Sequence, residues 1–141
     1  MYDDKNLIYI FTILEAIEKI LEYSDAFSDA EEFFFANSQL QFNATVNLLI
    51  AIGEESKKID DAVKNDFDFP WKNIAKMRDK ISHNYRGIDP DLVWDILHDS
   101  LMELKKILVI AVHNTDDFYN ALNDALQSRY YLHLSYLKDT K

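Results

Sequence analysis

Only two glycines and two prolines occur among the 141 residues of this chain, and this scarcity of chain breakers strongly constrains its fold. Sheets and sandwiches require many tight turns, and tight turns depend on glycine and proline. Hydrophobic residues make up 48% of the chain, which is enough for the core of one domain of ordinary size. We therefore expect a single all-α domain over residues 1–141, built as an up-and-down helical bundle.

The spacing of apolar residues predicts where the helices lie. The clearest helix begins near Leu7, where leucine and isoleucine recur at alternating intervals of three and four residues as far as Leu21. Further helices are expected over residues 31–35, 38–63, 71–84, 90–112 and 115–137. Gly53 falls inside the helix expected over 38–63, where a missing side chain would let another helix approach closely.

Polar residues and chain breakers predict several helix ends. Ser28 and Ser38 are each followed three residues later by glutamate or glutamine, which is the spacing of a capping box. Asp89 before Pro90 combines an N-cap residue with a proline at the first helical position. Gly87 is expected to end the helix that precedes them.

The charge of the chain is unevenly distributed. The net charge of −10 argues against a broad surface that coats nucleic acid. Residues 70–90, however, carry five basic side chains against two acidic ones. The basic residues are Lys72, Lys76, Arg78, Lys80 and Arg86. A local basic patch on an acidic body can still hold a phosphate chain.

Arg78 and His83 stand out within this basic segment as candidate catalytic residues. Five residues correspond to about 140° on a regular helix, so the two side chains would not share a face. For both to act on one atom, the helix must loosen near Asn84, or a second copy of the chain must complete the site. Asp79 lies four residues before His83 and would share its face. The simpler interpretation is a surface arginine and a histidine that caps a helix end.

These residue types suit the cleavage of an RNA phosphodiester. Histidine titrates near neutral pH and can take the proton of a ribose 2′-hydroxyl or give one to the leaving 5′-oxygen. The arginine fork matches two phosphate oxygens and stabilises the charge of the transition state. Attack by the 2′-hydroxyl requires neither a metal ion nor water. The chain has no cysteine and no HExxH-like pair, so we expect no metal and no cofactor.

The octapeptide RDKISHNY combines arginine, a polar residue, three further residues, histidine, any residue and tyrosine. It resembles the signature of HEPN-domain ribonucleases, and most closely that of HepT-like toxins whose antitoxin is a minimal nucleotidyltransferase. The flanking segments IGEESKKI (52–59), FPWKNIAKMRDKISHNY (69–85) and GIDPDLVWDIL (87–97) are similar to that family as well. The likeness covers roughly residues 5–112.

The resemblance implies a HEPN-type bundle that forms a homodimer, with two motifs facing one cleft. It implies the toxin of a type VII-like toxin–antitoxin system, acting as a metal-independent endoribonuclease with Arg78 and His83 as catalytic residues and Asp79 in support. Tyr85 falls at the position that the partner nucleotidyltransferase adenylylates, which would add bulk and negative charge beside the histidine. Tyr85 could otherwise stack on a base or contact a phosphate. The other expected RNA phosphate ligands are Lys76, Lys80 and Arg86.

Residues 113–141 extend beyond the family-like core of residues 1–112. We expect them to add a C-terminal helix that contributes packing or dimer surface, rather than a docking site for the antitoxin or RNA. The longest apolar run, residues 107–112, is too short to span a bilayer, so no membrane association is expected. The lack of cysteine fits a reducing cytoplasm.

An alternative function belongs to a different class. Related helical bundles serve as non-catalytic, substrate-binding partner subunits of nucleotidyltransferases. The net charge of −10 favours this alternative, whereas the complete set of Arg78, His83 and Tyr85 favours the ribonuclease.

Overall fold

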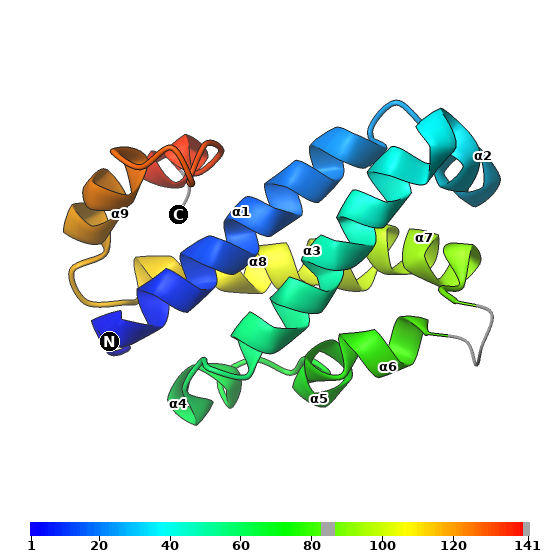
Figure 1. The fold of residues 1–141 in the computed structure, drawn as a ribbon. Helices are drawn as coiled ribbons and strands as arrows, with labels where there is room; N and C mark the ends of the chain where they lie inside the picture. Colours follow the sequence, from blue (N-terminus) through cyan, green and yellow to red (C-terminus); the bar gives the residue numbers. More distant parts are fainter. Residues whose placement is uncertain (83–86, 140–141) are drawn as a thin grey trace.

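Two long helices, α1 (Leu7–Ser24) and α3 (Leu40–Ser56), run side by side through the centre of the computed structural model (Figure 1). The structure describes residues 1–82 and 87–139. Helices α7 (Pro90–His98) and α8 (Ser100–His113) follow one another along the far side of this pair, and α8 packs on α1. The described residues thus form the all-α bundle that the sequence predicts.

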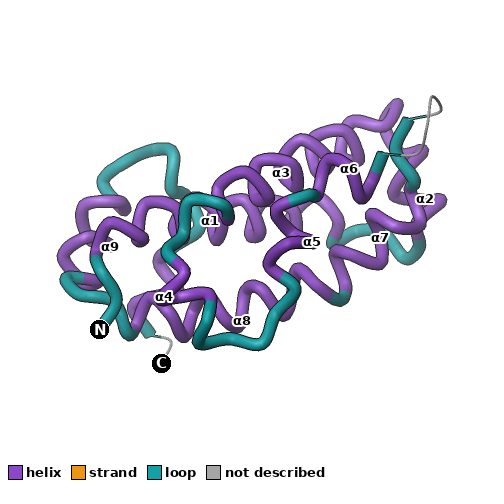
Figure 2. Tube along the Cα trace, turned by 90° about the horizontal axis from the view of Figure 1, so that it is seen from below, coloured by secondary structure: helices purple, strands orange, loops and turns teal. Residues whose placement is uncertain are grey.

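The remaining elements are short and lie around this centre (Figure 2). They are η1 (Asp4–Asn6), α2 (Ala30–Phe35), η2 (Ala36–Gln39), α4 (Asp61–Lys64), α5 (Trp71–Ala75), α6 (Met77–Ile81), α9 (Phe118–Leu126) and η4 (Ser135–Lys138). Within the described residues, no helix has the length and apolar character that crossing a membrane requires. The loop and short helices between α3 and α7 carry the basic segment.

The core follows the apolar spacing of α1. Leu7, Ile10, Leu14 and Ile17 are at most 3% exposed, as the intervals of three and four residues predict. Leu21 lies at the margin of the core and is only partly buried. Each fully buried leucine or isoleucine stabilises the fold by about 1.5–3 kcal/mol relative to an exposed position. The predicted pattern of this helix is therefore confirmed.

The two capping predictions were inaccurate. Asp29, rather than Ser28, caps α2, because its carboxylate accepts a hydrogen bond of 2.8 Å from the backbone N–H of Glu32. The Glu32 carboxylate in turn accepts from the backbone N–H of Ser28, so the reciprocal bonds exist one residue further along. Ser38 caps nothing, since residues 37–39 all have positive φ and α3 begins only after them.

The expected long helices are shorter or divided. The helix expected over 38–63 ends at Ser56, whose hydroxyl donates to the carbonyl oxygen of Gly53. The helix expected over 90–112 breaks at Asp99, which has φ −113° and ψ −84°. The helix expected over 115–137 ends at Leu126. Apolar spacing continues across each break because the flanking segments pack on the same core, and spacing alone therefore does not reveal the breaks.

The C-terminal extension folds back onto α1 through a histidine placed between two carboxylates. The backbone N–H and Nδ1 of His133 contact the Glu15 carboxylate at 2.8 and 2.7 Å, and Nε2 lies 2.8 Å from Glu22. The hydrogen bond to Glu15, aided by Glu22, raises the pKa of His133 against the opposing effect of burial. Leu134 and Leu137 are fully buried beside it. The described part of the extension is thus packed against the bundle.

Candidate active site

Helices α5 and α6 lie against α3 at Gly53. A Cβ atom at this position would lie 2.6 Å from the carbonyl oxygen of Ile74 and 3.1 Å from the Cβ of Met77. The first distance is shorter than real Cβ contacts. Ile74 and Met77 are themselves fully buried. A glycine is required here for close packing, as the sequence predicts, and this contact sets the position of the segment that carries Arg78.

The helix expected over residues 71–84 is divided and ends early. Lys76, with φ −99° and ψ +29°, separates α5 from α6. Helix α6 ends at Ile81, and Ser82 is extended, with ψ 141°. The Ser82 backbone N–H and hydroxyl both donate to the carbonyl oxygen of Arg78, at 3.2 and 2.7 Å, and so close the last turn. The helix therefore ends before His83 is reached.

Because α6 ends at Ile81, the angle that a regular helix would set between Arg78 and His83 does not apply. The separation of about 140° between Arg78 and His83 assumed a regular helix through both residues. The chain leaves the helix at Ser82, sooner than the loosening expected near Asn84. Gly87 does adopt a positive φ of 93°, but it lies beyond the helix end and does not form it.

The described residues on either side of positions 83–86 are joined by backbone contacts. Ser82 and Ile88 form an isolated antiparallel bridge, and the backbone N–H of Asp89 donates to the carbonyl oxygen of Ile81 at 3.1 Å. Asp89 then caps α7 by accepting from two backbone N–H groups, with Pro90 at the first helical position, as predicted. The chain is therefore anchored both before and after residues 83–86.

Three of the predicted site residues fall outside the described part of the chain. These are His83, Tyr85 and Arg86. Their roles therefore remain predictions, while the residues on α6 are placed by the structure. The described helix presents Arg78 and Asp79 to solvent and buries Met77.

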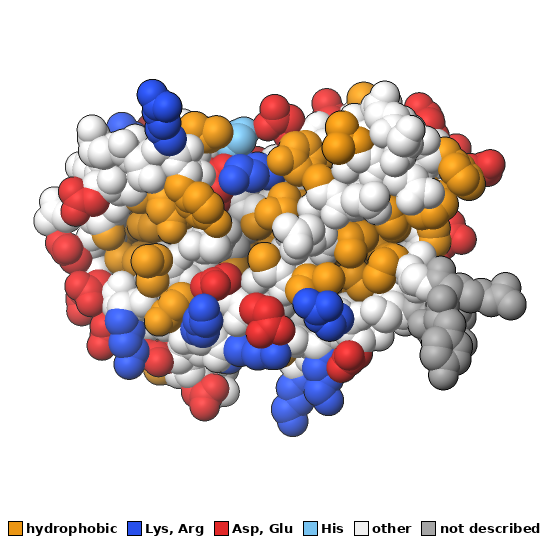
Figure 3. Space-filling view, in the orientation of Figure 1, with side chains coloured by type: hydrophobic (Ala, Val, Ile, Leu, Met, Phe, Trp, Pro, Cys, Tyr) orange, Lys and Arg blue, Asp and Glu red, His pale blue; other side chains and the backbone are white. Residues whose placement is uncertain are grey.

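The cations of α5 and α6 are exposed and available to a ligand. Lys76, Arg78 and Lys80 are all exposed, and none forms an ion pair with any residue that the structure describes. Figure 3 shows lysine and arginine side chains along the edge of the molecule formed by α4, α5 and α6, interspersed with a few acidic ones. The described part of the predicted basic segment therefore lies at the surface.

The sequence did not reveal the role of His133. Its two carboxylate partners lie 118 and 111 residues away along the chain, so no spacing rule connects them. Among the described residues, no group of three or more histidine, aspartate or glutamate side chains is arranged to hold a metal ion. His133 with its carboxylates thus belongs to the packing of the extension.

Comparison with known proteins identifies the relatives of this chain. A family described as "Ribonuclease HepT-like" matches residues 13–110. A Thermococcus cleftensis protein named "Probable ribonuclease HepT" is 36% identical over 102 residues, covering 69% of this chain and 86% of the relative. A Methanocaldococcus jannaschii protein named "Putative RNase MJ1380" is 29% identical and covers 70% of this chain and 88% of the relative.

A third relative is larger. The Methanocaldococcus jannaschii protein named "Gamma-glutamylcyclotransferase and putative RNase MJ0434" is 32% identical over 110 residues, or 77% of this chain. The match spans 48% of that relative, so the chain corresponds to about half of its length. No solved structure gave a significant match.

The close contact at Gly53 predicts whether a substitution there raises or lowers the free energy of unfolding. In a helix interior, glycine to alanine normally stabilises by about 1 kcal/mol. We expect Gly53→Ala to lower the free energy of unfolding instead, by about 1–3 kcal/mol, because the new methyl group meets the Ile74 carbonyl. The free energy of unfolding is measured by urea titration, with circular dichroism as the signal. Asn43→Ala, at an exposed position of α3, is the control and should change stability by less than about 0.5 kcal/mol. A Gly53→Ala protein as stable as the wild type would contradict the contact.

Proposed function

Because the chain belongs to the HepT-like ribonuclease family, we propose that it is an endoribonuclease in which Arg78 and His83 carry the reaction. The observation that supports this most directly is the setting of Arg78. Its guanidinium is exposed on a helix held in place by Gly53, and no described residue neutralises it. An exposed arginine that has no ion pair with a described residue, five positions before a histidine in the sequence, suits the binding of a phosphodiester.

The proposed reaction uses a nucleophile that belongs to the substrate. His83, as a general base, removes the proton of a ribose 2′-hydroxyl, and the 2′-oxygen attacks the adjacent phosphorus. The bond to the 5′-oxygen breaks, and that oxygen leaves with a proton from a general acid. The products are a 2′,3′-cyclic phosphate and a 5′-hydroxyl. Arg78 binds the non-bridging oxygens as their charge grows, and Asp79 supports the site.

Neighbouring cations are proposed to hold the flanking phosphates. Lys76 and Lys80 are exposed on the same segment as Arg78, and Arg86 follows eight residues after Arg78 in the sequence. The acidic remainder of the chain, with its net charge of −10, would disfavour unspecific binding elsewhere on the surface. RNA would then be concentrated along one edge of the molecule.

We propose further that the active form is a homodimer with two motifs facing one cleft. Phe35 and Leu40 are 63% and 66% exposed near the junction of α2 and α3, and α2 packs on α7, which follows the motif. Large apolar side chains exposed in this way are often covered by a partner subunit. Light scattering that found only monomers at the concentrations used for cleavage would remove this part of the proposal.

The proposed biological role is that of the toxin in a toxin–antitoxin pair, silenced by a partner nucleotidyltransferase. Tyr85 follows His83 by two residues in the sequence. An adenylate on Tyr85 would add bulk and negative charge where the RNA phosphate binds, so the modified protein would lose affinity for RNA.

Substitutions at the two proposed catalytic residues test the ribonuclease. We expect His83→Ala to lower the cleavage rate of a short RNA by about 100-fold or more, and Arg78→Ala by a similar factor. Arg78→Lys keeps the positive charge but cannot make a bidentate contact with the phosphate, so its cleavage rate should be intermediate. Arg129→Ala is the matched control, since Arg129 is exposed in the extension and should leave the rate unchanged. An RNA left intact by the wild type would favour the non-catalytic partner subunit instead.

Intact mass tests the proposed silencing. After incubation with the partner nucleotidyltransferase and ATP, the wild type should gain whole adenylate units and lose its cleavage activity. Tyr85→Phe should keep both its mass and its activity, because it lacks the acceptor hydroxyl. Unchanged mass in the wild type, or equal labelling of Tyr85→Phe, would contradict modification at this residue while leaving the ribonuclease proposal intact.

A further inference from the structure

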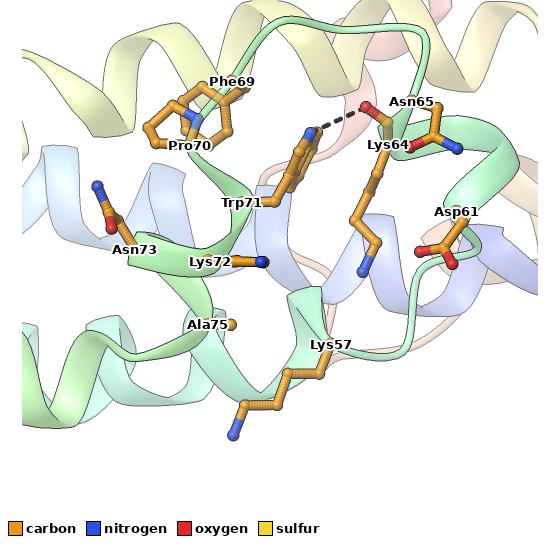
Figure 4. Close-up of a pocket in the computed structure, with 10 residues that line it drawn as sticks. All are labelled: Lys57, Asp61, Lys64, Asn65, Phe69, Pro70, Trp71, Lys72, Asn73 and Ala75. Atoms are coloured by element: carbon orange, nitrogen blue, oxygen red, sulfur yellow. Dashed lines mark hydrogen bonds between the residues drawn. The ribbon is translucent and has the colours of Figure 1, made fainter.

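A pocket of about 600 Å³ lies beside α5, between that helix, α4 and the end of α3 (Figure 4). We propose that it binds one nucleotide of the RNA substrate, with the base stacked on Trp71 and the adjoining phosphate held by Lys72. This inference rests on the proposed ribonuclease function and adds a substrate-binding site to it.

The indole of Trp71 is fixed in place at the pocket wall. Its Nε1–H donates to the carbonyl oxygen of Lys64 at 3.0 Å and lies 3.4 Å from that of Phe67. The ring of Phe69 packs edge-on against it, with centroids 5.0 Å apart. The ring nonetheless lines the pocket and is only half-buried. An immobilised aromatic face that a ligand can reach is the usual platform for an unpaired RNA base.

The charges around the pocket favour an anion. Three lysines line it, Lys57, Lys64 and Lys72, against the single carboxylate of Asp61. Lys57, the residue after α3, is paired with a glutamate of that helix, and Lys64 is oriented by a hydrogen bond to a backbone carbonyl. Lys72 is exposed and forms no ion pair with any described residue. Lys72 is therefore the cation most available to a phosphate.

Amide groups complete the pocket. Asn65 and Asn73 both line it and are exposed. An amide side chain has two N–H donors and one acceptor oxygen, so it can form hydrogen bonds with the edge of any base. The combination of an aromatic face, a free cation and amides suits a nucleotide better than it suits the apolar side chains of a protein partner.

The pocket is lined in part by α5, which directly precedes the proposed catalytic residues in the chain. Lys72 precedes Arg78 by six residues, and both are exposed on the short segment formed by α5 and α6. Lys76 is exposed between them, so cations recur from the pocket to the arginine. A nucleotide in the pocket would therefore lie beside the scissile phosphate rather than at it, and it would hold the strand in register for cleavage.

Binding of an uncleavable RNA tests the pocket without requiring catalysis. A fluorescent single-stranded oligonucleotide with 2′-O-methyl groups is titrated with protein at several salt concentrations. We expect Lys72→Ala to weaken binding and to reduce the slope of log affinity against log salt by about one, as loss of one phosphate contact would. Trp71→Leu should weaken binding by about tenfold, the loss expected for one stacked base. Lys138→Ala, an equal change of charge on η4, is the control and should bind as the wild type does.

Tryptophan emission gives a readout that a folding defect in Trp71→Leu would not confuse. The chain has two tryptophans, so Trp94→Phe leaves Trp71 alone. Stacking of a base should quench its emission on addition of the same oligonucleotide, and Lys72→Ala should shift the quenching to higher RNA concentrations. Unquenched emission together with unchanged binding of Lys72→Ala would overturn the proposal. If emission is unquenched and RNA binding is unchanged, but Lys72→Ala no longer binds the nucleotidyltransferase, the RNA proposal is overturned and the pocket is assigned to that partner.

The outcomes separate this proposal from the ribonuclease itself. Loss of binding in Lys72→Ala, in a protein that never cleaves RNA, would support the pocket and reject the catalytic proposal. Cleavage with unchanged KM in both Lys72→Ala and Trp71→Leu would support the catalytic proposal and reject the pocket.

Discussion

The close packing of α3 against α5 and α6 at Gly53 is the contact on which the candidate site depends. Only the absence of a side chain lets the Ile74 carbonyl lie so near the Gly53 backbone. Met77 and Ile81 are buried in the core, and Arg78 lies on the exposed face of α6. A shift of this helix pair would move the arginine and the proposed pocket together, because both belong to the same short segment.

The sequence predicts this arrangement well where one local signal is decisive. Leu7 and Ile10 begin a regular apolar pattern that is buried as expected, and Asp89 with Pro90 opens a helix as expected. The close packing at Gly53 could also be inferred, since a glycine inside a helix allows another segment to approach closely. The family was identifiable from the motif and its flanks, and the match over residues 13–110 confirms it.

The sequence could not predict features that depend on distant residues. Ile74 and Ile81 keep a helical spacing across the break at Lys76, so the division of α5 from α6 is invisible to periodicity. The attachment of His133 to Glu15 joins residues 118 positions apart. The pocket around Trp71 is likewise formed by three elements whose approach is determined by packing rather than by local pattern.

The central claim is that this chain cleaves RNA through the ribose 2′-hydroxyl, with Arg78 on the phosphate. The most direct test follows one RNA that the wild type cuts at a mapped position, beside the same RNA with a single 2′-deoxyribose there. The account predicts a 2′,3′-cyclic phosphate and a 5′-hydroxyl from the first RNA, and no cut at that position in the second. Cleavage at the deoxyribose, or a product with a 5′-phosphate, would contradict it.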